Sequence, residues 1–186
     1  PGADFSVFEN GFLVSGSLSS YAEVGYVAVS SNGTDFAEFI PRVVPDTTQL
    51  GAFAGLSGGL PVLTNVETNS IDPFDPVVSG GEAFDLADLL DDPLVVGGSV
   101  DLDSIAFVRL RDVPLGAVDG SGVPIVDSAP GNPDFDAVAV IQHAGLASSS
   151  QPVCDLSFDA FDRLVVTIGD PDGLGDYLRQ LAMSQL

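Results

Sequence analysis

The sequence predicts an all-β protein, and three observations lead to that class. Its 186 residues include 21 Gly and 13 Pro, which divide the chain into segments too short for a helical bundle. Several of these segments alternate polar and apolar residues, or are rich in β-branched and aromatic residues. Hydrophobic residues make up 45% of the chain, enough for a packed core despite a formal net charge of −22. We therefore expect a folded domain with acidic loops.

The order of the expected elements follows from the turn signals between them. Asn10-Gly11 ends a first strand, and a Ser-Asn-Gly-Thr turn joins the next two strands into a β-hairpin. A long region punctuated by Pro, Gly and Asp follows, and one or two helical turns are expected near its end. The expected strands are residues 4–9, 23–30, 36–40, 104–111, 135–141 and 163–168, the irregular region is 41–98, and the helical turns are 84–90.

A Ser-rich segment that begins at residue 148 divides the chain into two parts. Residues 1–147 are expected to form the β-domain, and a Ser-rich linker then leads into residues 148–186. This second part contains the last strand and apolar residues at helical spacing from Leu174 to Ala182. We expect a short amphipathic C-terminal helix that buries its apolar face on the β-domain or on a partner chain.

The charge balance excludes several partners. The chain has 27 acidic residues, five Arg and no Lys, so it lacks the basic surface that binding to nucleic acid or an anionic membrane requires. No apolar run approaches the ~20 residues of a membrane span. The single cysteine, Cys154, cannot form a disulfide within the chain. Because 22 of the carboxylates belong to Asp, loops, caps and cation binding account for them better than helix surfaces do.

The hairpin carries a resemblance to known β-sandwiches. Residues 24–39 resemble the V-x-V-S-x-D-G-x-x-F hairpin of discoidin-like (coagulation-factor type C) and other galactose-binding-like domains. Residues 105–110 look like the strand of those families that crosses the opposite sheet, and residues 134–140 look like the closing strand. The resemblance implies an antiparallel β-sandwich of the jelly-roll type.

Two further motifs resemble uncharacterised bacterial cell-surface modules. Residues 1–12 resemble the signature P-G-x-D-F-x-V-F-E-N-G-F, and residues 80–89 are similar to G-G-x-x-F-D-L-A-D-L. A final F-D-x-D-A-V motif is matched at residues 135–138 with one Asp fewer between Phe and Ala. The resemblance covers about residues 1–146 and implies an extracellular, cell-surface or periplasmic location.

Calcium is the cofactor that the sequence favours, because the hard oxygen ligands of Ca²⁺ are plentiful and only one His and one Cys are present for zinc. Similarity to jelly-roll carbohydrate-binding modules implies a structural calcium between the first and last strands. The candidate ligands are Asp4, Glu9, Asn10, Asp134 and Asp136. A second acidic group could bind cations or could start turns and cap helices: Asp72, Asp75, Asp85 and Asp88.

Catalytic chemistry has little support. His143 is the only imidazole, and no Gly-x-Ser-x-Gly motif accompanies it. Pairs of carboxylates could hydrolyse glycosides, but in so acidic a chain their presence says little. Arg109 and Arg111 alternate along one strand, so they should share a face, where they could meet acidic residues or orient a sugar or carboxylate ligand.

These observations together predict a non-catalytic extracellular or cell-surface module for binding or assembly, stabilised by calcium. Carbohydrate binding is one alternative, and a structural subunit of a filament, surface layer or larger complex is another. Expected partners are surface glycans or other protein subunits, with oligomers forming through a sandwich edge or the C-terminal helix. Nucleic acid and membrane insertion are not expected.

Overall fold

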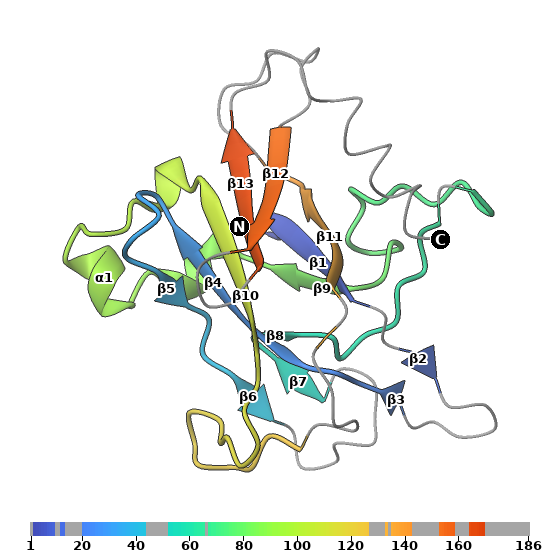
Figure 1. Cartoon of the computed structure of the whole chain (residues 1–186), viewed down its shortest axis with the longest axis horizontal. Helices are drawn as coiled ribbons and strands as arrows, with labels where there is room; N and C mark the ends of the chain where they lie inside the picture. The colour runs from blue at the N-terminus through green and yellow to red at the C-terminus, as the bar shows by residue number, and fades with distance from the viewer. Residues whose placement is uncertain are drawn as a thin grey trace.

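The computed structural model describes residues 2–9, 12–13, 20–43, 52–65, 67–126, 133, 135–142, 153–158 and 164–169. Its elements are mostly short strands with very little helix (Figure 1). The strands are β1 (Phe5–Glu9), β2 (Phe12–Leu13), β3 (Ser20–Tyr21), β4 (Gly25–Ser30), β5 (Ala37–Glu38), β6 (Arg42–Val43), β7 (Phe53–Ala54), β8 (Leu56–Ser57), β9 (Glu82–Phe84), β10 (Phe107–Asp112), β11 (Phe135–Val140), β12 (Val153–Phe158) and β13 (Leu164–Gly169). The helical turns are η1 (Leu86–Leu89), α1 (Pro93–Val96) and η2 (Leu102–Ser104).

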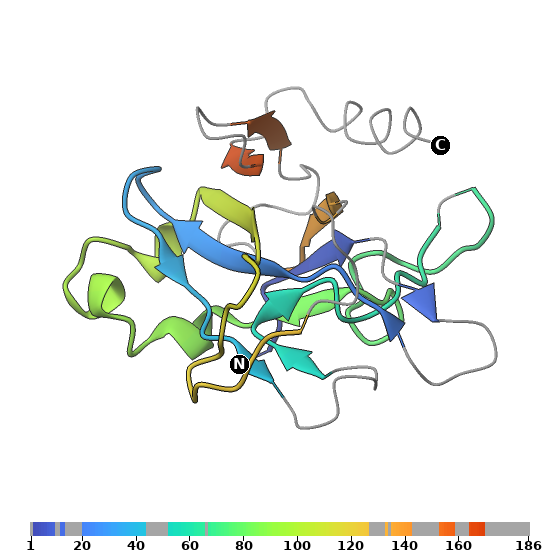
Figure 2. The ribbon, with the colours of Figure 1, turned by 60° about the horizontal axis from the view of Figure 1, so that its bottom comes forward.

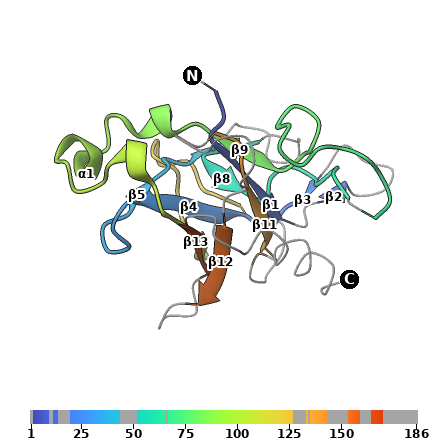
Figure 3. The same ribbon diagram turned by 90° about the horizontal axis from the view of Figure 1, so that it is seen from above.

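Two antiparallel sheets make up the sandwich. The smaller sheet has the order β11-β1-β9, so β1 lies between β11 and β9. The larger sheet has the order β12-β13-β10-β4-β5, and β8 also pairs with β4. The long strands β4 and β10 lie side by side, with β12 and β13 beyond β10 (Figures 1 and 2). The turns around α1 lie at one end of the molecule, next to β5 (Figure 3).

A hydrophobic core fills the space between the sheets. Phe5 and Val7 of β1 and Phe84 of β9 pack with Val29 of β4 and Val108 of β10, and all five are at most 3% exposed. The rings of Phe5 and Phe84 are stacked with their centroids 5.2 Å apart. Burial of alternate side chains from two facing sheets is the packing expected of a β-sandwich.

Residues of the turn itself stabilise the hairpin of β4 and β5. In the register of β4 with β5, Ala28 lies opposite Glu38. Asn32 Oδ1 accepts hydrogen bonds from the backbone N–H groups of Thr34 and Asp35 at 2.8 and 2.9 Å, and Gly33 adopts a φ of 74°. Asn and Gly are favoured here because they satisfy such a turn locally and tolerate positive φ.

The all-β prediction is confirmed, and the expected strands correspond to β1, β4, β5, β10, β11 and β13. The helical turn expected at residues 84–90 is confirmed as η1. The prediction that residues 41–98 lack strands is wrong, because β6, β7, β8 and β9 lie there. Strand β12 was not expected, and β10 pairs with β4 in the sheet of the hairpin, not in the opposite one.

Strands β12 and β13, which belong to residues 148–186, extend the larger sheet beyond β10. The linker at 148–152, His143 and the helix expected from Leu174 to Ala182 lie outside the described residues. Within the ranges described, the structure contains no helix long and apolar enough to span a membrane.

Candidate functional site

The structure places Asp4 and Glu9, two of the predicted calcium ligands, at opposite ends of β1. Asp4 precedes the strand and Glu9 ends it, so their Cα atoms are about 16 Å apart at the rise of an extended chain. Asp4 Oδ2 accepts a hydrogen bond from the backbone N–H of Leu86 at 2.7 Å, which fixes the start of η1. Glu9 is 1% exposed at the other end. Asp4 and Glu9 therefore do not share a site.

Asp136 lies closer to Glu9 than Asp4 does. It is an exposed residue of β11, directly after Phe135, which pairs with Glu9 across a bulge. Asn10 and Asp134 lie outside the described residues. In the part of the chain that the structure describes, no group of three or more His, Cys, Asp or Glu side chains is arranged to hold a metal ion.

In the second acidic group, the carboxylates of Asp72, Asp75 and Asp85 accept hydrogen bonds from backbone N–H groups. Asp72 and Asp75 each accept a hydrogen bond from an N–H two residues later, at 2.9 and 3.0 Å. Asp85 caps η1 through the N–H of Ala87 and also accepts from the N–H of Gly2 at 2.8 Å. The Gly2 bond is the main reason that the pKa of Asp85 is lowered. For these three residues, turn and cap chemistry is the correct interpretation.

Arginine and aromatic side chains gather on the side of β4 and β10 that faces away from the core between the sheets, where Tyr26 also packs against a second buried cluster around Leu56. Arg109 and Arg111 alternate with the buried Val108 and Leu110, so the prediction that both arginines share a face is confirmed. The Cζ atom of Arg109 lies 4.0 Å from the ring centroid of Phe36.

Arg111 also meets an acidic residue there, as expected. Its Cζ atom lies 4.4 Å from the ring centroid of Tyr26, and its Nη2 donates to Glu38 Oε2 at 2.8 Å. The side chains of Arg111 and Glu38 remain 38% and 33% exposed. We call Tyr26, Phe36, Glu38, Arg109 and Arg111 the arginine–aromatic face.

Two carboxylates lie inside the sandwich. Glu82 pairs with Val7 in the register of β9 with β1, and Glu9 is two residues further along β1, so all three side chains share the core-facing side. Glu82 is 6% exposed and Glu9 is 1% exposed. Both carboxylates lie next to Gly58: its N–H donates to Glu82 Oε2 at 2.9 Å, and a Cβ built on it would lie 3.2 Å from Glu9 Oε2.

Burial dominates the acid–base behaviour of Glu82. Loss of solvation raises the pKa of its carboxyl group from 4.5 to about 8. Backbone N–H groups, chiefly those of Gly58 and Leu60, oppose this rise without cancelling it. Among the residues described, Glu82 Oε1 is buried and has no hydrogen-bond partner.

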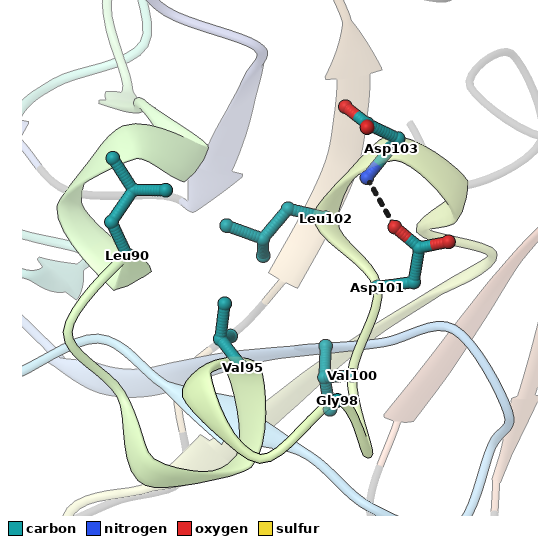
Figure 4. A pocket seen from close by; sticks show the side chains of 7 residues that line it. All are labelled: Leu90, Val95, Gly98, Val100, Asp101, Leu102 and Asp103. Atoms are coloured by element: carbon teal, nitrogen blue, oxygen red, sulfur yellow. Dashed lines mark hydrogen bonds between the residues drawn. The ribbon is translucent and has the colours of Figure 1, made fainter.

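A shallow pocket of about 410 Å³ lies between η1, α1 and η2. Its floor is apolar, and Leu90, Val95 and Leu102 project toward its middle (Figure 4). Asp101 and Asp103 lie on one side, where Asp101 Oδ1 accepts the N–H of Asp103 at 3.1 Å as the cap of η2. One carboxylate oxygen of Asp101 thus caps η2 and serves the fold.

Comparison of the chain with protein-family models, with curated proteins and with solved structures found no match. The function must therefore be inferred from the residues of this chain and their arrangement.

Proposed function

We propose that the chain is a non-catalytic cell-surface binding module, a jelly-roll type β-sandwich that binds neutral glycans on the arginine–aromatic face. The observation that carries the proposal is the solvent-accessible ion pair of Arg111 and Glu38, set beside the ring of Tyr26. A sugar hydroxyl both donates and accepts hydrogen bonds, so it can bridge a guanidinium and a carboxylate. Aromatic rings next to such a pair offer apolar area to the C–H face of a sugar.

The overall charge favours a neutral ligand over an acidic one. A net charge of −22 repels polyanions at low ionic strength, and two arginines on one face do not reverse that field. Neutral sugars feel no such repulsion, and their affinity should change little with salt. The extracellular or periplasmic setting suits a glycan ligand.

A glycan array probed with the wild-type chain in 150 mM NaCl tests the proposal. We expect neutral oligosaccharides to bind, and the Arg111→Gln variant to bind them at least tenfold more weakly, because the hydrogen-bonding fork and the ion pair are lost. The control is Arg42→Gln, an exposed arginine of β6, which should bind like wild type. An array without signal, or an Arg111→Gln variant with unchanged affinity, would contradict the proposal.

Assembly with other subunits is the second candidate, favoured by an apolar surface. The strongly exposed side chains of Ile40, Leu115, Val118 and Val126 lie on or beside the loop 113–126, where Val118 pairs with Pro124. Gly120 in this loop lies against Ile40, since a Cβ built on it would be 2.9 Å from Ile40 Cγ2. Apolar patches of this kind often mark interfaces.

Size-exclusion chromatography with light scattering tests the assembly candidate. If this surface joins subunits, the wild-type chain at high concentration should exceed the 19.1 kDa of a monomer, and Leu115→Asp should return it to a monomer. Leu115 is fully exposed, so the substitution should leave folding intact. A wild-type monomer at every concentration would contradict the assembly role.

A further inference from the structure

We propose that Glu9 and Glu82, together with the main-chain carbonyl of Glu23, form an internal calcium site beside Gly58. This site would join β1, β9 and the turn after β8. It differs from a calcium site between the first and last strands, because Glu82 belongs to β9 and lies on the other side of β1 from β11. It is independent of glycan binding on the arginine–aromatic face.

The register brings the two carboxylates within reach of one ion. Val7 and Glu82 are direct partners across the β1–β9 ladder, and Glu9 is the diagonal neighbour of Glu82 on the same face. Diagonal neighbours are roughly 7–8 Å apart between their Cα atoms, a gap that two Glu side chains can close. Both carboxylates lie beside the turn after β8: Gly58 N–H donates to Glu82 Oε2, and Glu9 Oε2 lies next to the Cα atom of Gly58.

Gly58 also brings a carbonyl oxygen to this place. A Cβ built on Gly58 would lie 2.0 Å from Glu23 O and 3.2 Å from Glu9 Oε2, so both oxygens lie on one side of its Cα atom. Carboxylate and carbonyl oxygens are the ligands that Ca²⁺ takes in proteins. Mg²⁺ demands an octahedral shell and retains several waters, so an interior site with a rigid carbonyl suits it less.

Glu82 Oε1 is the independent sign of a ligand. The side chain is more than nine-tenths buried, and its Oε2 atom is satisfied by Gly58 N–H. Oε1 is buried without a hydrogen-bond partner among the described residues, a costly arrangement unless a cation or proton occupies it. A divalent cation bound here would coordinate this oxygen of Glu82.

The test measures Ca²⁺ binding directly, with the full chain in buffer freed of metal. Equilibrium dialysis against Ca²⁺ counts bound ions, and thermal unfolding records the change in Tm with CaCl₂ or with MgCl₂ at matched ionic strength. For a wild-type chain at 100-fold excess over Kd, we expect a rise in Tm of about 5–10 °C that Mg²⁺ does not reproduce.

The Glu82→Gln variant should lose one bound Ca²⁺ and most of the rise in Tm. Gln can still accept from Gly58 N–H, and its folding is checked by circular dichroism; if it does not fold, Glu9→Gln replaces it. The matched control is Glu67→Gln, an exposed position that should keep both the ion and the rise. Equal Ca²⁺ effects in Glu82→Gln and Glu67→Gln would overturn the proposal. A wild-type Tm that does not change with Ca²⁺ would also overturn the proposal. It would indicate that a proton, not a cation, occupies Glu82 Oε1.

Discussion

Replacing the buried Gly58 by Ala should destabilise the protein far more than a Gly-to-Ala change in an open turn. The backbone at Gly58 has a φ of 86°, where an L side chain costs roughly 1–2 kcal/mol. In addition, the new Cβ would lie 2.0 Å from the carbonyl oxygen of Glu23, and neither backbone can yield without moving β8 or the segment before β4. We expect a loss of about 4 kcal/mol or more in the free energy of unfolding.

Gly122→Ala separates the two causes. Gly122 has a φ of 81° but nothing within 4 Å of its built Cβ. The Gly122→Ala variant should therefore lose stability only through the strain of an L residue at positive φ. Urea unfolding of both variants should therefore show a difference of about 2 kcal/mol or more, with Gly58→Ala the less stable. Equal losses would mean that the turn after β8 does not press against Glu23, and the proposed calcium site would lose its carbonyl ligand.

The second large effect is a pH-dependent gain in stability from Glu82→Gln in metal-free buffer. Because the pKa of Glu82 is raised from 4.5 to about 8, the folded state binds this proton more tightly than the unfolded state. The stability that the proton confers is fully present below pH 4.5 and is lost as the pH rises through 8. Gln stays neutral throughout and escapes this loss.

Between pH 5 and pH 8, the unfolding free energy of Glu82→Gln should therefore rise relative to wild type by roughly 3 kcal/mol, from 1.36 kcal/mol per pKa unit. The repulsion among the other carboxylates is the same in both proteins, so it drops out when the unfolding free energies of the variant and the wild type are compared at the same pH. Glu67→Gln, which alters an exposed carboxyl group, should show no comparable trend. Parallel curves for wild type and Glu82→Gln would show that Glu82 is solvated. Saturating Ca²⁺ should reverse the order of the two proteins at pH 8.

Local signals made much of the sandwich predictable from the sequence. The hairpin of β4 and β5 was predictable because Asn32 and Gly33 satisfy the turn within four residues. Strands β1, β10 and β11 carry long enough alternation or β-branched content to be recognised. Strands of two or three residues, such as β6 and β9, carry no periodicity, and only tertiary pairing defines them.

In the candidate sites, too, local sequence predicted some features, while others depend on tertiary pairing. Alternation predicted that Arg109 and Arg111 share a face, but their partners come from beyond β4: Glu38 belongs to β5, and Phe36 directly precedes it. Glu82 follows two glycines and has the appearance of a loop residue, so its burial was missed. The signal was present, however: Glu82 is two residues before the core residue Phe84, and in a strand that spacing puts both on one face.

The most direct test of the central claim, glycan binding at the arginine–aromatic face, is an NMR titration of the ¹⁵N-labelled chain with the strongest glycan from the array. The side-chain Nε–Hε signals of Arg109 and Arg111 report on the face itself, and that of Arg42 serves as the internal reference. We predict that the signals of Arg109 and Arg111 shift and saturate together while that of Arg42 stays in place. Saturable binding that leaves Arg109 and Arg111 unchanged would contradict the account.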